Sequence, residues 1–330
     1  MKLFEYAAPR TEAEVLSLLS SEYGKTEILA GGTDLIGLMK KMIVTPDRVV
    51  NIMNVPSLQG IEPLPDGSVK IGAATTLDVI LESPYLKPYP AVRQAIAGIN
   101  SMQLQAQGTL GGELCQRPQC WFFRNGEGLL WYGRNGHAER DDRYHAIFDN
   151  EGPAKFVSAS RIAPALIALD AKVRIIGPEP DQEEVLPIAR FFQKPKNDQQ
   201  KETILRPNQL LTHVFLPPPD GWLNATYEVR QSVGPDFPLA AAACAFRHSG
   251  GIVREARIVL GQVAPTPWFS YEAVEALIGQ PVTVQSAEQA GQAAVARARP
   301  LHQNAYKIQL AKVAVKRAIL LAAGIDPGGF

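Results

Sequence analysis

Two glycine pairs are the residues of this chain whose type and setting best suit binding chemistry. Gly31-Gly32 ends the short apolar run Ile28-Leu29-Ala30, and Gly111-Gly112 follows Gly108-Thr109-Leu110. A glycine has no Cβ, so its backbone N–H can approach a phosphate or ring oxygen closely. A single pair is more often only a tight turn. The interpretation as a binding site therefore rests on finding two pairs.

Side chains beside the glycine pairs complete a candidate contact set. Thr33, Asp34 and Thr109 could hydrogen-bond a phosphate or hydroxyl group of a ligand, although Asp34 could equally cap a following helix. The predicted contacts are Leu29, Ala30, Gly31, Gly32, Thr33, Asp34, Leu35, Thr109, Leu110, Gly111, Gly112 and Glu113.

The surrounding pattern predicts that both pairs lie on loops next to helices. A capping pattern at Thr11 predicts a helix over residues 11–21, and a strand over residues 27–30 then enters the first pair. A helix over residues 34–41 would begin on that turn and direct its positive end at the loop, where a pyrophosphate is the natural occupant. Apolar residues at helical spacing predict a helix over residues 89–99 ahead of the second pair.

The rest of the chain divides into three stretches of different character. Residues 120–155 are rich in Arg, Asn, Gly and aromatic residues without a clear period, which predicts a long ordered loop. Phe215-Leu216-Pro217-Pro218-Pro219-Asp220-Gly221 is a stop signal suitable for a domain boundary. Beyond it, three strands followed by helices predict an α+β domain with a three-stranded antiparallel sheet. The strands are expected over residues 224–230, 239–247 and 252–260, and the helices over residues 270–278, 286–298 and 305–323.

Composition limits the classes of partner. The chain has 330 residues, 46% of them hydrophobic and 20% charged, which is enough for two or three domains with their own cores. Its 33 basic and 33 acidic residues leave no net charge, so neither nucleic acid nor a membrane is the expected partner. The sequence shows no signal-peptide core and no apolar window of membrane-spanning length. We expect the protein to be cytoplasmic.

Cysteine and histidine residues do not predict a metal site. Cys115, Cys120 and Cys244 cannot form a closed set of disulfides, which agrees with a reducing compartment. Cys115 and Cys120 lie five residues apart with no second pair following, unlike a zinc site. His137 and His145 lie among arginine and acidic residues without metal-type spacing, so a solvated, salt-bridged loop is expected there.

Several segments, in the order found in one family, resemble the flavin-binding medium subunit of the molybdenum hydroxylases. This family includes carbon monoxide dehydrogenase, bacterial xanthine dehydrogenases, aldehyde oxidoreductases and 4-hydroxybenzoyl-CoA reductase. The resemblance runs over nearly the whole length. The segments are Ala30-Gly31-Gly32-Thr33-Asp34-Leu35, Gly108-Thr109-Leu110-Gly111-Gly112, Ala163-Pro164-Ala165-Leu166-Ile167-Ala168-Leu169-Asp170-Ala171, Asp236-Phe237-Pro238-Leu239-Ala240, Val263-Ala264-Pro265-Thr266-Pro267 and Ala305-Tyr306-Lys307-Ile308.

The resemblance implies an α+β fold with a PCMH-type FAD-binding domain over residues 1–220 and a C-terminal flavoprotein domain over residues 221–330. The first domain would comprise subdomains of about residues 1–55 and 56–220, with the inserted loop in the second. FAD would lie between these subdomains, with the first glycine pair on its pyrophosphate and the second near its isoalloxazine. An iron–sulfur small subunit and a molybdopterin large subunit are the implied partners, and the chain would pass their electrons through FAD to an external acceptor. No catalytic acid or base is expected.

Two departures from the family pattern affect the predicted site. One branch of the family holds a [4Fe-4S] cluster in the inserted loop, and Cys120 resembles its first ligand. Because residues 121–243 contain no cysteine and a cluster needs about four thiolates, we expect no metal here. Arg161 and Ile162, which resemble flavin contacts, follow Ser160 where many relatives have Ser-Asp-Leu. A guanidinium at Arg161 would favour reduced, anionic flavin if it reaches the ring.

Two other functions stay open at this point. The missing cluster ligands and the altered Arg161 also suit a stand-alone FAD-dependent oxidoreductase that acts directly on a small substrate. A degenerate scaffold without flavin is the third hypothesis. The intact glycine pairs argue against it, because a chain that no longer binds FAD would not need them.

Overall fold

The computed structural model describes residues 1–131, 141–232 and 234–328. The chain forms two compact units, each assembled from separate stretches of sequence. Unit 1 comprises Met1–Tyr85, Ser101–Leu129 and Asp170–Pro218. Unit 2 comprises Leu86–Asn100, Leu130–Leu169 and Pro219–Phe330.

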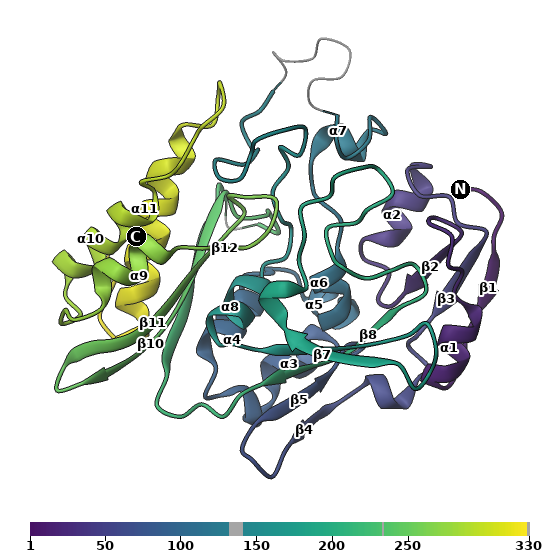
Figure 1. The fold of residues 1–330 in the computed structure, drawn as a ribbon, viewed down its shortest axis with the longest axis horizontal. Helices are drawn as coiled ribbons and strands as arrows, with labels where there is room; N and C mark the ends of the chain where they lie inside the picture. The colour runs from purple at the N-terminus through teal and green to yellow at the C-terminus, as the bar shows by residue number, and fades with distance from the viewer. Residues whose placement is uncertain (132–140, 233, 329–330) are drawn as a thin grey trace. The chain divides into compact units, whose positions relative to one another are not determined.

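Unit 1 begins with a small parallel sheet of three strands in the order β1-β3-β2 (Figure 1). Helix α1 (Glu12–Leu18) starts where the capping pattern predicted, because the Thr11 hydroxyl accepts the N–H of Glu14. Val15 and Leu16 of α1 are buried in one apolar cluster with Val50 of β3. Helix α2 (Leu35–Lys40) follows the first glycine pair. The strands are β1 (Glu5–Ala7), β2 (Thr26–Leu29) and β3 (Arg48–Asn51).

A second sheet of unit 1 has five strands in the order β4-β5-β8-β6-β7, and every neighbouring pair is antiparallel. Its central strand β8 was not predicted, and it includes Phe215 and Leu216, the first two residues of the predicted stop signal. The strands are β4 (Ile61–Pro63), β5 (Val69–Gly72), β6 (Lys172–Ile176), β7 (Glu183–Pro187) and β8 (Leu210–Leu216). The α-helices of this part are α3 (Leu77–Glu82), α5 (Met102–Gln107), α6 (Leu110–Cys115) and α7 (Trp121–Arg124), and 3-10 turns occur at Pro56–Leu58, Pro84–Leu86 and Ile188–Arg190.

The sheet of unit 2 has four antiparallel strands in the order β12-β11-β10-β9, so the prediction of three strands is wrong. The additional strand β12 (Trp268–Phe269) pairs with Val259 and Leu260 of β11. Two residues directly after Pro267 are too few to show the two-residue period that predicts a strand. The predicted strands are present as β9 (Leu223–Val229), β10 (Ala240–Ser249) and β11 (Ile252–Gly261).

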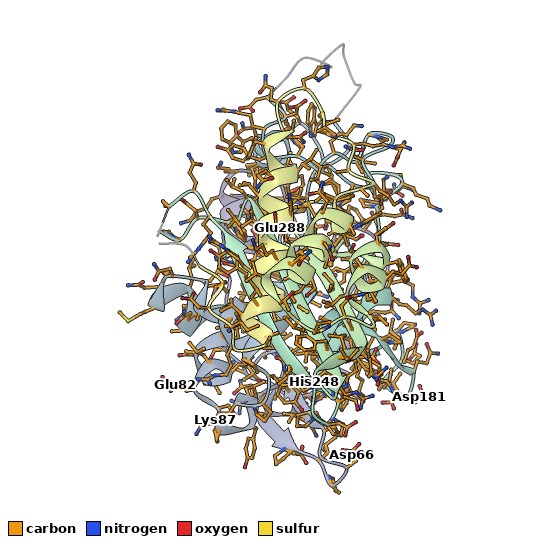
Figure 2. The ribbon with its side chains drawn as sticks, turned by 90° about the vertical axis from the view of Figure 1, so that its left-hand side faces the viewer. Asp66, Glu82, Lys87, Asp181, His248 and Glu288 are labelled. Carbon is orange, nitrogen blue, oxygen red and sulfur yellow. The ribbon has the colours of Figure 1, made fainter. Side chains whose placement is uncertain are left out.

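Alanine makes β10 a strand that is buried on both faces. Alternate residues Ala242, Cys244 and Phe246 belong to the apolar cluster that includes the C-terminal helices, and the intervening alanines are also buried. Figure 2 faces these helices, with Glu288 labelled on α10, where its carboxylate lies 2.9 Å from Lys316 Nζ of α11. The helices of unit 2 are α4 (Pro90–Ala97), α8 (Ala163–Ala168), α9 (Tyr271–Leu277), α10 (Val284–Ala294) and α11 (Tyr306–Ala322).

The predicted loop over residues 120–155 is more structured than expected. It contains α7, and its described part beyond residue 140 is held to the start of α11. Asp142 is buried and accepts the backbone N–H groups of His302 and Gln303, while Lys307 Nζ donates to the carbonyl of His145 over 3.1 Å. His145 is buried, which lowers its pKa to about 4, so this residue is not solvated, whereas Arg143 and Asp141 form the expected salt bridge over 2.6 Å. His137 lies outside the described residues.

Candidate functional site

A pocket of about 430 Å³ lies within unit 1 and brings the two glycine pairs together. Its wall includes residues from β2, the start of α2, α6 and the loop before β8. The predicted contacts that line it are Ala30, Gly31, Gly32, Thr33, Asp34, Leu35, Thr109, Gly111 and Gly112. Segments far apart in sequence therefore share one cavity, as the paired motif suggested.

The first glycine pair has a backbone that only glycine fits. A Cβ on Gly31 would lie 1.5 Å from the carbonyl oxygen of Gln107, so the chain there must approach closely. Gly32 has φ +73°, a conformation that side chains disfavour. Within the described residues, the backbone N–H groups of residues 31–35 have no hydrogen-bond acceptor. All five residues of this run line the pocket, so their unsatisfied N–H groups are donors at its wall.

The second glycine pair lies in the first turn of α6, so the prediction that it lies on a loop is wrong. Thr109 is the N-cap, and its hydroxyl accepts the N–H of Gly112 over 3.1 Å. The N–H groups of Leu110, Gly111 and Glu113 donate to the carbonyls of Thr75, Ala73 and Thr109. Every backbone donor of this turn is therefore used inside the protein, which a sequence pattern of glycines does not reveal.

Close packing explains Gly111. A Cβ at this position would lie 2.9 Å from the Cβ of Ala73 and 3.0 Å from its carbonyl oxygen. Contacts that short require a neighbour to move. The second pair therefore lets α6 lie close to the end of β5 and shapes the pocket wall without donating to it.

Asp34 does not cap α2 with its side chain. Its carboxylate accepts the backbone N–H of Arg117 over 2.8 Å and a guanidinium N–H of Arg124 over 2.6 Å. Arg124 also donates to the carbonyls of Pro118 and Arg117. Asp34 thus fastens residues 117–124 to the loop of the first glycine pair.

Two further ion pairs belong to the pocket wall and were not predicted. Arg117 Nε lies 2.9 Å from a carboxylate oxygen of Glu202, and Lys201 Nζ lies 2.7 Å from one of Glu27. Cys115, which is half-buried, also lines the pocket, where desolvation by the surrounding protein raises the pKa of its thiol to about 12. The thiol is therefore protonated at neutral pH and unsuited to act as a nucleophile or metal ligand.

The other predicted contacts do not line this pocket. Leu29 is the last residue of β2, and Leu110 and Glu113 are buried in α6. Arg161 and Ile162 belong to unit 2. There the Arg161 guanidinium pairs with Glu228, with Nε 2.9 Å from Oε1, and donates to the carbonyl of Gly98. Their role as flavin contacts stays a prediction.

Two further features of the described residues bear on metal binding and on membrane crossing. Among the described residues, no group of three or more His, Cys, Asp and Glu side chains could hold a metal ion. Over the same part of the chain, no helix has the length and apolar character needed to cross a bilayer.

Comparison with protein families and known proteins places this architecture. Residues 2–219 match the family model described as the FAD binding domain in molybdopterin dehydrogenase, and residues 225–322 match the CO dehydrogenase flavoprotein C-terminal domain. The aldehyde oxidoreductase FAD-binding subunit PaoB of Escherichia coli (strain K12) is 30% identical over 317 residues, which cover 94% of this chain and 96% of PaoB. The carbon monoxide dehydrogenase medium chain of Hydrogenophaga pseudoflava is 28% identical and covers 96% of each chain.

A solved structure agrees with these matches. Carbon monoxide dehydrogenase from Hydrogenophaga pseudoflava, in a form lacking the Mo-pyranopterin moiety of the molybdenum cofactor, superposes with a TM-score of 0.76 at 25% identity, and the match covers 97% of both chains. The family resemblance noted in the sequence is thus confirmed. The chain belongs to the family of FAD-binding oxidoreductase subunits that combine the FAD binding domain in molybdopterin dehydrogenase with the CO dehydrogenase flavoprotein C-terminal domain.

Proposed function

We propose that this chain is the FAD-binding electron-transfer subunit of a heteromeric molybdenum hydroxylase and that its flavin occupies the pocket of unit 1. The observation that carries the assignment is the run of unsatisfied backbone N–H groups over residues 31–35. Such donors suit the oxygens of a pyrophosphate, which needs several hydrogen bonds and tolerates no intervening Cβ. When bound, FAD would supply the chemistry that links iron–sulfur carriers to an external acceptor.

The residues of the pocket fit this cofactor in distinct ways. The volume of about 430 Å³ is in the usual range of about 300–1,000 Å³ for small-molecule sites. Residues 31–35 would bind the pyrophosphate through their backbone, and the Thr33 side chain, which is exposed, would add a hydroxyl donor. Gly111 and Gly112 would form a close-packed wall. We retain Leu29, Ala30, Leu35, Thr109, Leu110, Glu113, Arg161 and Ile162 as proposed parts of the FAD environment.

The partners proposed are an iron–sulfur small subunit and a molybdopterin large subunit. The support is that relatives are named medium chains, which implies companion chains. We also propose a cytoplasmic location, because none of the three cysteines is disulfide-bonded. For the domains we propose residues 1–220, with subdomains of about 1–55 and 56–220, and residues 221–330. The two family matches support this division, since they meet between residues 219 and 225.

Flavin content of two glycine variants tests the site. Gly32 and Gly60 both have positive φ, +73° and +91°, so alanine strains the backbone at both sites; a Cβ on Gly32 would in addition lie 3.2 Å from Ile36 Cγ1, an atom of a side chain that can shift. Only Gly32 lines the pocket. We expect the wild-type chain and Gly60→Ala to retain FAD, measured by absorbance after release, while Gly32→Ala loses most of it. Circular dichroism would verify that both variants fold. A wild-type chain that neither contains nor takes up FAD contradicts the proposal.

Metal analysis tests the proposed complex. If the chain is purified from its native host with its partners attached, we expect iron and molybdenum to accompany FAD. A preparation that contains FAD alone and oxidises a small substrate without partners would favour the stand-alone oxidoreductase instead.

A further inference from the structure

The carboxylates that line the pocket of unit 1 are each matched by a cation. Glu27 pairs with Lys201, Glu202 with Arg117, and Asp34 with Arg124. All three pairs are partly shielded from solvent, and the pair of Arg117 and Glu202 most of all, with each side chain 10% exposed. The negative charge of the lining is therefore compensated within the protein before any ligand binds.

Arg206 is different from the other charged side chains of the lining. It is exposed, and within the described residues its guanidinium has neither an ion pair nor a hydrogen bond. Its backbone, in contrast, is fixed in a turn. The Arg206 N–H donates to Gln209 Oε1 and its carbonyl accepts the N–H of Gln209, both over 3.0 Å. Pro207 further restricts the turn. The ordered turn therefore fixes the backbone of a residue whose positive charge is not neutralised within the described chain, at the wall of the pocket.

We propose that Arg206 binds the diphosphate of FAD through its guanidinium. This inference rests on the proposed function. The amides of residues 31–35 line the same pocket and can donate hydrogen bonds to phosphate oxygens, but they carry no net charge to offset its two negative charges. A guanidinium offers charge and paired donors that match phosphate oxygens. Because its backbone is already ordered, placing Arg206 against the ligand requires ordering only its side chain.

Binding measurements on the full-length apoprotein test this residue. Dissociation constants for FAD and for riboflavin, which has no phosphate, would be measured by fluorescence for the wild type, Arg206→Gln, Arg206→Lys and Arg10→Gln. Arg10 is a matched control because it is an exposed arginine of unit 1 whose N–H also bonds a following side chain, that of Glu14, and it does not line the pocket.

We expect Arg206→Gln to weaken FAD binding by roughly tenfold or more, as for a lost hydrogen bond to a charged group. The FAD affinity of Arg206→Lys should lie between those of the wild type and Arg206→Gln, and the FAD affinity of Arg10→Gln should equal that of the wild type. Riboflavin binding should be the same in all four proteins, and added salt should weaken FAD binding more in the wild type than in Arg206→Gln. Equal FAD affinity in the wild type and Arg206→Gln, or an equal loss for riboflavin, would overturn the role of Arg206 alone. Failure of the wild type to bind FAD would overturn the proposed function as well.

Discussion

Gly31-Gly32 and Gly111-Gly112 line the same pocket, yet their backbones do different things. Within the described residues, the donors from Gly31 to Leu35 have no acceptor, whereas all four donors from Leu110 to Glu113 are satisfied by Thr75, Ala73 and Thr109. A pair of glycines can therefore mean either open donors or close packing. What separates the two cases is where the neighbouring carbonyl and hydroxyl groups lie, which is a tertiary property.

The largest expected effect comes from adding one methyl group to the first pair. Gly31→Ala would place a Cβ 1.5 Å from the Gln107 carbonyl oxygen, so two backbone segments would have to separate. We expect a loss of more than about 4 kcal/mol in the free energy of unfolding, measured by urea denaturation. Gly37→Ala in α2 is the control, since a Cβ there meets nothing within 4 Å and should leave stability equal or slightly higher. A stable Gly31→Ala protein would show that this close approach does not exist.

The same change in the second pair should have a smaller effect and a different character. Gly111→Ala would bring a Cβ within 2.9 Å of Ala73 Cβ, an overpacking that costs about 1–3 kcal/mol. Adding Ala73→Gly should recover part of that loss in thermal unfolding. FAD affinity of the folded variant should change little, because Gly111 donates its N–H to Ala73 rather than to the pocket. A large loss of FAD affinity without a loss of stability would reverse the roles assigned to the two pairs.

Two threonines, one beside each pair, can separate stability from binding. Thr109→Ala removes the N-cap of α6 and should lower the free energy of unfolding by about 1 kcal/mol. Thr33→Val should leave the stability of the apoprotein unchanged, since the Thr33 hydroxyl is exposed and has no partner within the described chain, but should weaken FAD binding. Thermal unfolding and FAD titration of both variants measure the contrast. If both variants lose the same stability and the same FAD affinity, the two threonines do not have the different roles assigned to them.

Local sequence signals were sufficient for much of the fold. The Thr11 cap, the loop of the first glycine pair and the C-terminal helix α11 lie at or near the expected places, because short stretches of sequence determine them. The second glycine pair lines the expected pocket but lies inside α6. The two-residue strand β12 and the central strand β8 form by pairing with other strands, and neither shows a two-residue alternation of apolar and polar residues that would predict it. The ion pairs of the pocket could not be predicted either, because they join residues that are far apart in the sequence. Lys201 and Glu27, for example, are 174 positions apart in the chain.

The smallest expected effect concerns pH and the last residue of α6. Burial raises the pKa of the Cys115 thiol to about 12, from an ordinary value of 9.0 that the unfolded chain should show. Between these values the unfolded state releases a proton that the folded state keeps, so the contribution of Cys115 to stability is present below pH 9 and is lost as pH rises above it. At pH 9.5 the loss should be under about 1 kcal/mol. Urea denaturation of the wild type and Cys115→Ala at pH 7.5 and 9.5 measures it, with Cys115→Ala losing less stability between the two. Cys115 lies at the pocket wall, in the same helix as the second glycine pair. If the stability of the wild type depends on pH as little as that of Cys115→Ala, the thiol is hydrated in the folded protein. The pocket wall formed by α6 would then be less closely packed than the contacts of Gly111 indicate.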